Sequence, residues 1–122
     1  SYRNISPLTA LEAGRQIAKA YFVPSPIQNI SKARSKFAEL VSTTESSSRI
    51  EIITHSITIQ AEWGFFEMIS GDWKCGTNNL DKAIDRLSIW QPMINDQGNM
   101  MQLLRSKKSS LSKKAEQKNA GC

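Results

Sequence analysis

The sequence predicts an all-α fold, a compact bundle of about five helices followed by a basic tail. Three observations support this prediction. Apolar residues recur at helical spacing in successive segments, prolines and capping residues separate these segments, and the most apolar segment does not keep the alternation of a β-strand. A chain of 122 residues is long enough to bury one hydrophobic core without staples. We therefore expect a single helical domain over residues 1–104 and a Ser/Lys-rich, partly disordered tail over 105–122.

The most apolar segment of useful length, residues 49–70, is predicted to form the central helix. Its isoleucines would suit a strand, but the adjacent Ile52 and Ile53 break a period of two. At helical spacing the apolar residues instead form two stripes beside one polar face. Ser48 and Glu51 fit a capping box at the start of this helix. A helix that is apolar on two sides has to be covered on both, so we expect it to be central.

Two helices are predicted before the central one, over residues 7–22 and 26–42. Ser6 and Pro7 suit the cap and the first position of the first helix, and Ser25 with Pro26 suit the same places in the second. Helical spacing puts Ile17 on the inward stripe of the first helix and Ile27 on that of the second.

Two more helices are predicted after the central one, over residues 79–91 and 97–110. The residues from Gly71 to Gly76 suit a tight connection, because glycine permits left-handed geometry. Pro92 is expected to end the fourth helix. The fifth helix is expected to fray beyond Lys108 into the tail.

Positive charge is concentrated at the end of the chain. Residues 105–122 contain six Lys or Arg and one acidic residue, an excess equal to the net charge of +5 of the whole chain. The folded body is therefore close to neutral. No apolar run approaches the ~20 residues of a membrane-spanning helix, and no signal peptide is evident. The cytoplasm is the expected compartment, with nuclear import as a second option because the lysine pairs of the tail loosely match a two-part import signal.

This charge distribution favours a non-enzymatic nucleic-acid-binding protein, without sequence specificity and with RNA the favoured partner. Flexible cations suit a phosphate backbone, because their binding releases counterions. A solvated helix face and a solubilising tail are the alternative interpretation of the same residues. The predicted phosphate contacts lie on the second helix and in the tail: Lys32, Arg34, Lys36, Arg105, Lys107, Lys108, Lys113 and Lys114.

Aromatic residues near the end of the central helix suggest a second function, a protein interaction or self-assembly module. Trp63, Phe65 and Phe66 point in different directions on a helix, so one small bundle cannot easily bury all three. Together with Trp73 they form a predicted partner interface, for a homodimer or for docking on a larger nucleoprotein or polymerase. A core packed from both sides, with tryptophan at its edge, is the alternative.

No residue pattern indicates catalysis, a metal or a cofactor, and we expect the protein not to be an enzyme. The one histidine, His55, lies on a polar helix face with Glu51 one turn before it, which suits a surface pair better than a catalytic base. Cys75 and Cys122 lack metal-ligand spacing and are expected to be free thiols in a reducing compartment. Gly71 and Gly76 lack the Lys-Ser/Thr that follows a phosphate loop.

Overall fold

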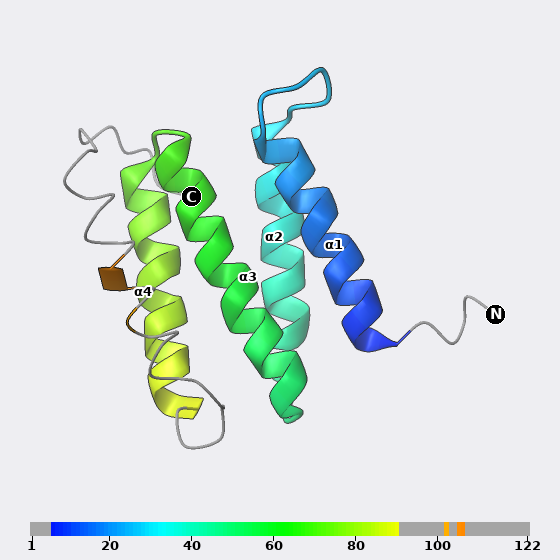
Figure 1. Cartoon of the computed structure of the whole chain (residues 1–122), viewed down its shortest axis with the longest axis vertical. Helices are drawn as coiled ribbons and strands as arrows, with labels where there is room; N and C mark the ends of the chain where they lie inside the picture. The colour runs from blue at the N-terminus through cyan, green and yellow to red at the C-terminus, as the bar shows by residue number, and fades with distance from the viewer. Residues whose placement is uncertain (1–5, 91–101, 103–104, 107–122) are drawn as a thin grey trace. The chain divides into compact units, whose positions relative to one another are not determined.

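The structure is a computed structural model that describes residues 6–90, 102 and 105–106. The described residues form helices and turns, with no strand among them, so the predicted all-α class is confirmed. Their main elements are α1 (Pro7–Phe22), α2 (Ile30–Thr44), α3 (Ile50–Ile69) and α4 (Trp73–Trp90), shown in Figure 1. The chain divides into two compact units, Ser1–Ile59 and Gln60–Cys122, and the boundary falls within α3.

Helix α1 begins and ends where the sequence predicts. The Ser6 hydroxyl accepts a hydrogen bond from the Thr9 amide at 3.1 Å and caps the helix, and Pro7 takes its first position. Leu11, Ala18 and Phe22 are buried. The inward placement of Ile17 is wrong, because this side chain is 47% exposed. The face of α1 that packs against α2 is therefore narrower than the apolar stripe that the sequence predicts.

Helix α2 begins at Ile30, later than the predicted residue 26. The cap is Asn29, whose side-chain oxygen accepts from the Lys32 amide at 3.0 Å. Ser25 instead takes part in a turn, in which its hydroxyl accepts from the Ile27 amide at 3.2 Å. Ile27 is 60% exposed and is not on the buried face. Both Ser25 and Asn29 are good caps, and the longer connection to α1 uses the second.

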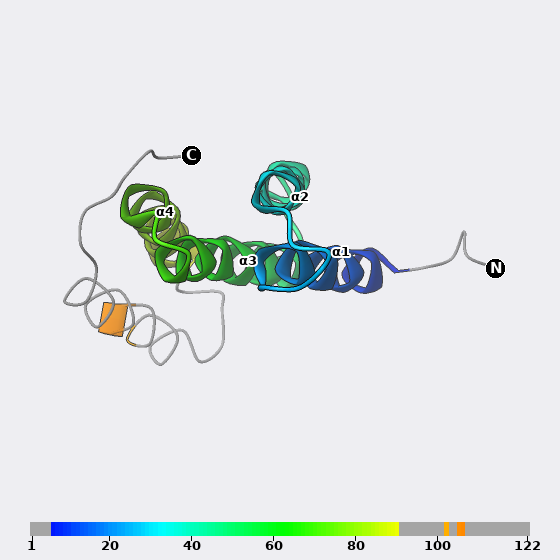
Figure 2. The same cartoon turned by 90° about the horizontal axis from the view of Figure 1, so that it is seen from above.

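The first unit is built around the contact of α1 with α2, which lie side by side and run in opposite directions (Figures 1 and 2). The rings of Phe22 and Phe37 meet with centroids 5.8 Å apart and planes tilted by 46°. Both side chains are fully buried. The first half of α3 adds Ile53 and Ile57 to the core. A buried hydroxyl pair, with Thr44 donating to Ser56 at 2.6 Å, joins α2 to α3.

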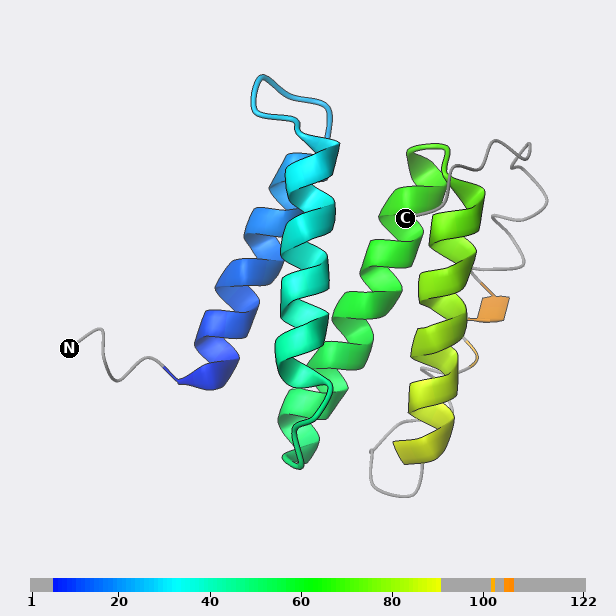
Figure 3. The same ribbon diagram turned by 180° about the vertical axis from the view of Figure 1, so that it is seen from behind.

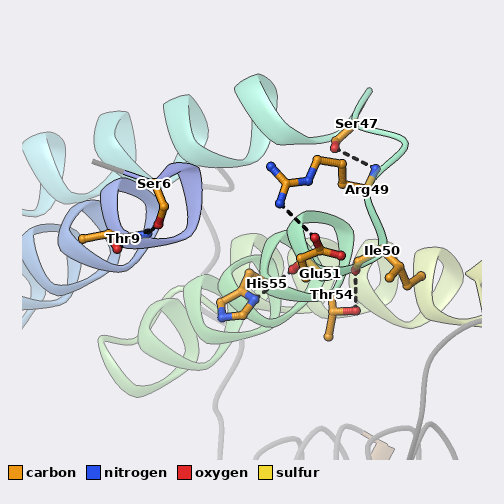
Figure 4. Close-up of polar contacts among 8 residues, drawn as sticks. All are labelled: Ser6, Thr9, Ser47, Arg49, Ile50, Glu51, Thr54 and His55. Carbon is orange, nitrogen blue, oxygen red and sulfur yellow. Dashed lines mark hydrogen bonds and ion pairs between the residues drawn. The ribbon is translucent and has the colours of Figure 1, made fainter. Parts of the chain in front are cut away.

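Helix α3 starts one residue later than predicted and by a different device. The Ser47 hydroxyl accepts from the Arg49 amide at 3.1 Å, and the Glu51 carboxylate pairs with the Arg49 guanidinium at 2.9 Å (Figure 4). The Glu51 side chain therefore points toward Arg49. In the predicted capping box it would instead reach back to Ser48.

In the second unit, α3 and α4 are joined by a turn of only three residues, Ser70 to Asp72. Gly71 has φ of +105°, which a side chain would strain. The Asp72 carboxylate accepts from the Cys75 amide at 3.0 Å and caps α4, which begins at Trp73 rather than at residue 79. The predicted connection through Gly76 is wrong, because Gly76 lies inside the helix.

Gly64 and Gly76 are buried where α3 and α4 pack together, in the hairpin that Figure 3 shows from behind. A β-carbon on Gly64 would lie 2.8 Å from the Gly76 carbonyl oxygen and 3.1 Å from the Leu80 amide nitrogen. A β-carbon on Gly76 would lie 2.7 Å from the Gly64 carbonyl oxygen. The two backbones thus approach at a distance that leaves no room for a side chain at either position.

The predicted fifth helix (97–110) and the tail (105–122) fall mostly outside the described residues. Gln102, Arg105 and Ser106 have helical backbone and exposed side chains. Four predicted phosphate contacts lie outside the described residues: Lys107, Lys108, Lys113 and Lys114.

Candidate nucleic-acid interface

Lys32 and Tyr21 form the most distinctive cationic feature of the first unit. Lys32 lies in the first turn of α2 and is exposed, and Tyr21, near the end of α1, is half-buried. The Lys32 Nζ atom lies 5.8 Å from the centroid of the Tyr21 ring, within the range of a cation–π contact. The chain reversal between α1 and α2 brings these residues together. The ammonium group of Lys32 therefore lies over the face of the Tyr21 ring.

Lys36 lies one helical turn after Lys32 but is already paired. Its Nζ atom is 2.9 Å from the Glu39 carboxylate, and that carboxylate side chain is 56% exposed. Exposed pairs of this kind contribute about 0–1 kcal/mol. The charge of Lys36 is therefore partly neutralised, in a pair that a stronger anion can displace.

Arg34 does not share a face with Lys32 and Lys36. Two residues along a helix correspond to a rotation of about 200°, so Arg34 points away from the surface on which the two lysines lie. It is half-buried and has partners of its own. The phosphate contacts predicted for Lys32, Arg34 and Lys36 therefore do not all lie on one face of α2.

A surface groove of about 440 Å³, which we call the Tyr21 groove, runs between α1 and α2. Ile17, which the sequence pattern placed on the inward face of α1, is exposed and supplies apolar surface to this groove. Tyr21, Lys32 and Lys36 supply an aromatic face and two cations. The six lining residues are Ile17, Tyr21, Lys32, Ser35, Lys36 and Glu39.

The predicted aromatic interface consists of half-buried side chains. Trp63, Phe65, Phe66 and Trp73 are neither fully buried nor fully exposed. The Trp63 indole nitrogen donates to the carboxylate of the fully buried Glu67 at 2.9 Å, so this tryptophan is tied into the second unit. Sequence reasoning missed Ile69, which follows Phe65 by one helical turn and is 71% exposed.

His55 does not form the predicted pair with the Glu51 carboxylate. Its Nδ1 atom lies 2.9 Å from the Glu51 backbone carbonyl oxygen, as Figure 4 shows. Hydrogen bonding from Arg49 instead lowers the pKa of the Glu51 carboxyl. Across from His55 on α1, hydrogen bonds from Gln16 and then Arg15 lower the pKa of Glu12. These are surface interactions, and they do not assemble a nucleophile with a base.

Cys75 is fully buried and disulfide-bonded, which corrects the expectation of free thiols. The sequence has one other cysteine, Cys122, which lies outside the described residues. The expectation of free thiols depended on a reducing compartment, whereas stable disulfides are typical of oxidising ones.

Comparisons with known proteins do not assign a family. No family model, curated protein or solved structure matches the chain. Within the described residues, no helix is both long and apolar enough to cross a membrane. In that same part of the chain, no group of three or more His, Cys, Asp or Glu side chains is placed to hold a metal ion.

Proposed function

We propose that this protein is a non-enzymatic RNA-binding protein that holds single-stranded RNA without sequence specificity. The observation that carries the proposal is the pairing of Tyr21 with Lys32 in the Tyr21 groove. Proteins that hold single strands without sequence preference combine a positively charged groove with aromatic rings on which bases stack. In this proposal a base displaces the Lys32 ammonium group from the Tyr21 ring and stacks there, and Lys32 then neutralises an adjacent phosphate.

The remaining contacts are with phosphates and come from two sources. Lys36 joins Lys32 once a phosphate displaces Glu39, which costs little because the pair is exposed. The tail supplies the larger number of cations, beginning with the exposed Arg105 and continuing through the lysines that follow it. A groove contact with a cationic tail predicts modest affinity and strong salt dependence.

The role of the Tyr21 groove is tested with a fluorescent oligouridylate. Its binding is measured by fluorescence anisotropy between about 50 and 200 mM salt. We expect Tyr21→Ala to weaken binding about tenfold, since one stacked base contributes about 1–3 kcal/mol. Tyr21→Phe keeps the ring and should bind as the parent does. Lys32→Gln should lower the slope of log affinity against log salt by about 0.7, the value for one phosphate of a single strand.

Two further measurements make this test decisive. Lys82→Gln is the matched control, because it removes an exposed lysine of α4 and should leave binding unchanged. Changing Lys107, Lys108, Lys113 and Lys114 to glutamine tests the tail while keeping Cys122. If Tyr21→Ala and Lys32→Gln bind as tightly as the parent, the groove has no part in binding. If the parent protein itself shows no salt-dependent binding, the proposed function is wrong.

The second candidate function is protein interaction or self-assembly through the end of α3. Ile69 is 71% exposed, and the half-buried Phe65 and Phe66 precede it by one turn, so their side chains lie on neighbouring parts of the helix surface. We expect Ile69→Ser to shift a dimer toward monomer in multi-angle light scattering without changing the far-UV circular dichroism spectrum. Ile17→Ser, at another exposed isoleucine, is the control. A monomeric parent at high concentration would exclude self-assembly.

A further inference from the structure

A second cavity lies in the first unit, away from Tyr21. Its volume is about 480 Å³, within the range of about 300–1,000 Å³ that is usual for small-molecule sites. We call it the Arg49 pocket. Its lining residues come from α1, α2, the first turn of α3 and the connection between α2 and α3, which contributes Ser47 and Arg49.

The inner part of the Arg49 pocket is apolar. Leu11, Leu40 and Ile52 are buried and belong to the core of the unit, so they form a fixed floor. Ala10, which has a short side chain, also lines the pocket and is exposed. The apolar area that a ligand can cover comes mainly from the exposed Pro7 and Ala10, and covering it removes that area from water.

The polar groups of the pocket carry a positive excess. Arg49, which is 54% exposed, and Lys36 are its two cations, and Glu39 is its one anion. Arg49 is paired with Glu51 only at the exposed surface, as Figure 4 shows, so its guanidinium can turn to a stronger anion at low cost. The Ser47 hydroxyl accepts from the Arg49 amide and keeps its own hydrogen to donate.

We propose that the Arg49 pocket binds a small amphipathic anion, one anionic headgroup on an apolar body. The headgroup pairs with Arg49 and Ser47, and the apolar body lies over the buried leucine floor against the exposed Pro7 and Ala10. A polyanion fits this pocket poorly, because most of its surface is aliphatic and Glu39 lies at its edge. A ligand cation would be repelled by Arg49 and Lys36, although Glu51 and Glu39 partly balance their charges. The site is thus distinct from the Tyr21 groove, although Lys36 and Glu39 line both.

Titration calorimetry tests this proposal. The full chain is titrated with octanoate, octyl phosphate, octan-1-ol and octylamine. We expect the two anions to bind with one-to-one stoichiometry and the alcohol and amine to bind at least tenfold more weakly, because a hydrogen bond to a charged group contributes about 1.5–3 kcal/mol. The tighter of the two anions identifies the headgroup as carboxylate or phosphate. Octan-1-ol binding as tightly as both anions would overturn the proposal, and so would the absence of binding by either anion.

Matched variants locate the site. Arg49→Gln should weaken octanoate at least tenfold, whereas Arg15→Gln, which also removes an arginine paired with a glutamate, should not. Ala10→Phe should block the pocket, whereas Ala13→Phe, at an exposed alanine of the same helix outside the pocket lining, should not. Circular dichroism melting confirms that each variant folds. Equal binding by Ala10→Phe and Ala13→Phe would place octanoate elsewhere and refute the assignment.

Discussion

Phe37→Ala is expected to destabilise the first unit by about 3–5 kcal/mol, the usual loss when a large aromatic side chain is removed from a core. Phe37 is fully buried, and its ring packs against Phe22 at 5.8 Å. Neighbouring helices cannot collapse fully into the space, because α1 and α2 are already held in contact along their length. Urea unfolding followed by far-UV circular dichroism measures the loss.

Two controls show whether the Phe22–Phe37 contact itself contributes. Ile27→Ala removes a large side chain that is 60% exposed and should change the free energy of unfolding by no more than about 0.5 kcal/mol. A double-mutant cycle with Phe22→Ala should give a coupling of about 0.5–1.5 kcal/mol, the range for aromatic pairs. A loss below about 1 kcal/mol for Phe37→Ala would contradict its placement in the core.

Gly64→Ala is expected to destabilise the second unit by about 1–3 kcal/mol, although alanine is the better helix former. The new methyl group would lie 2.8 Å from the Gly76 carbonyl oxygen and 2.9 Å from Leu80 Cγ. The first of these is a backbone atom, so α3 and α4 have to move apart. Urea unfolding again measures the effect, and Gly76→Ala should behave in the same way.

Gly14→Ala is the matched control for the glycine contact. Its β-carbon would meet Leu40 Cδ2 at 2.7 Å, but that atom is the end of a side chain that can rotate away. The gain in helix propensity, about 0.5–1 kcal/mol, should then make the variant neutral or slightly more stable. If Gly14→Ala and Gly64→Ala lower stability by equal amounts, the close backbone approach of α3 and α4 is wrong.

The candidate site could be predicted only in part. The sequence indicated that Lys32 and Lys36 are exposed cations one turn apart, because residues four positions apart lie on the same side of a helix. It could not show that Tyr21 lies beside Lys32, since that contact depends on how the chain reverses after Phe22. The pairing of Lys36 with Glu39 follows from their spacing on one helix. The Arg49 pocket does not follow from the sequence, because side chains of several helices line it.

The sequence by itself determined the helical class and the positions of α1 and α3, because Ser6, Pro7 and the apolar periodicity act through residues adjacent in the chain. The tertiary structure decided between equivalent local signals. Asn29 rather than Ser25 caps α2, and Gly76 lies inside α4 rather than in a loop. A residue that can cap a helix, or a glycine, looks the same in the sequence whether it takes that role or lies elsewhere. The neighbouring helix decides between the roles, and at Gly76 it requires a close backbone approach.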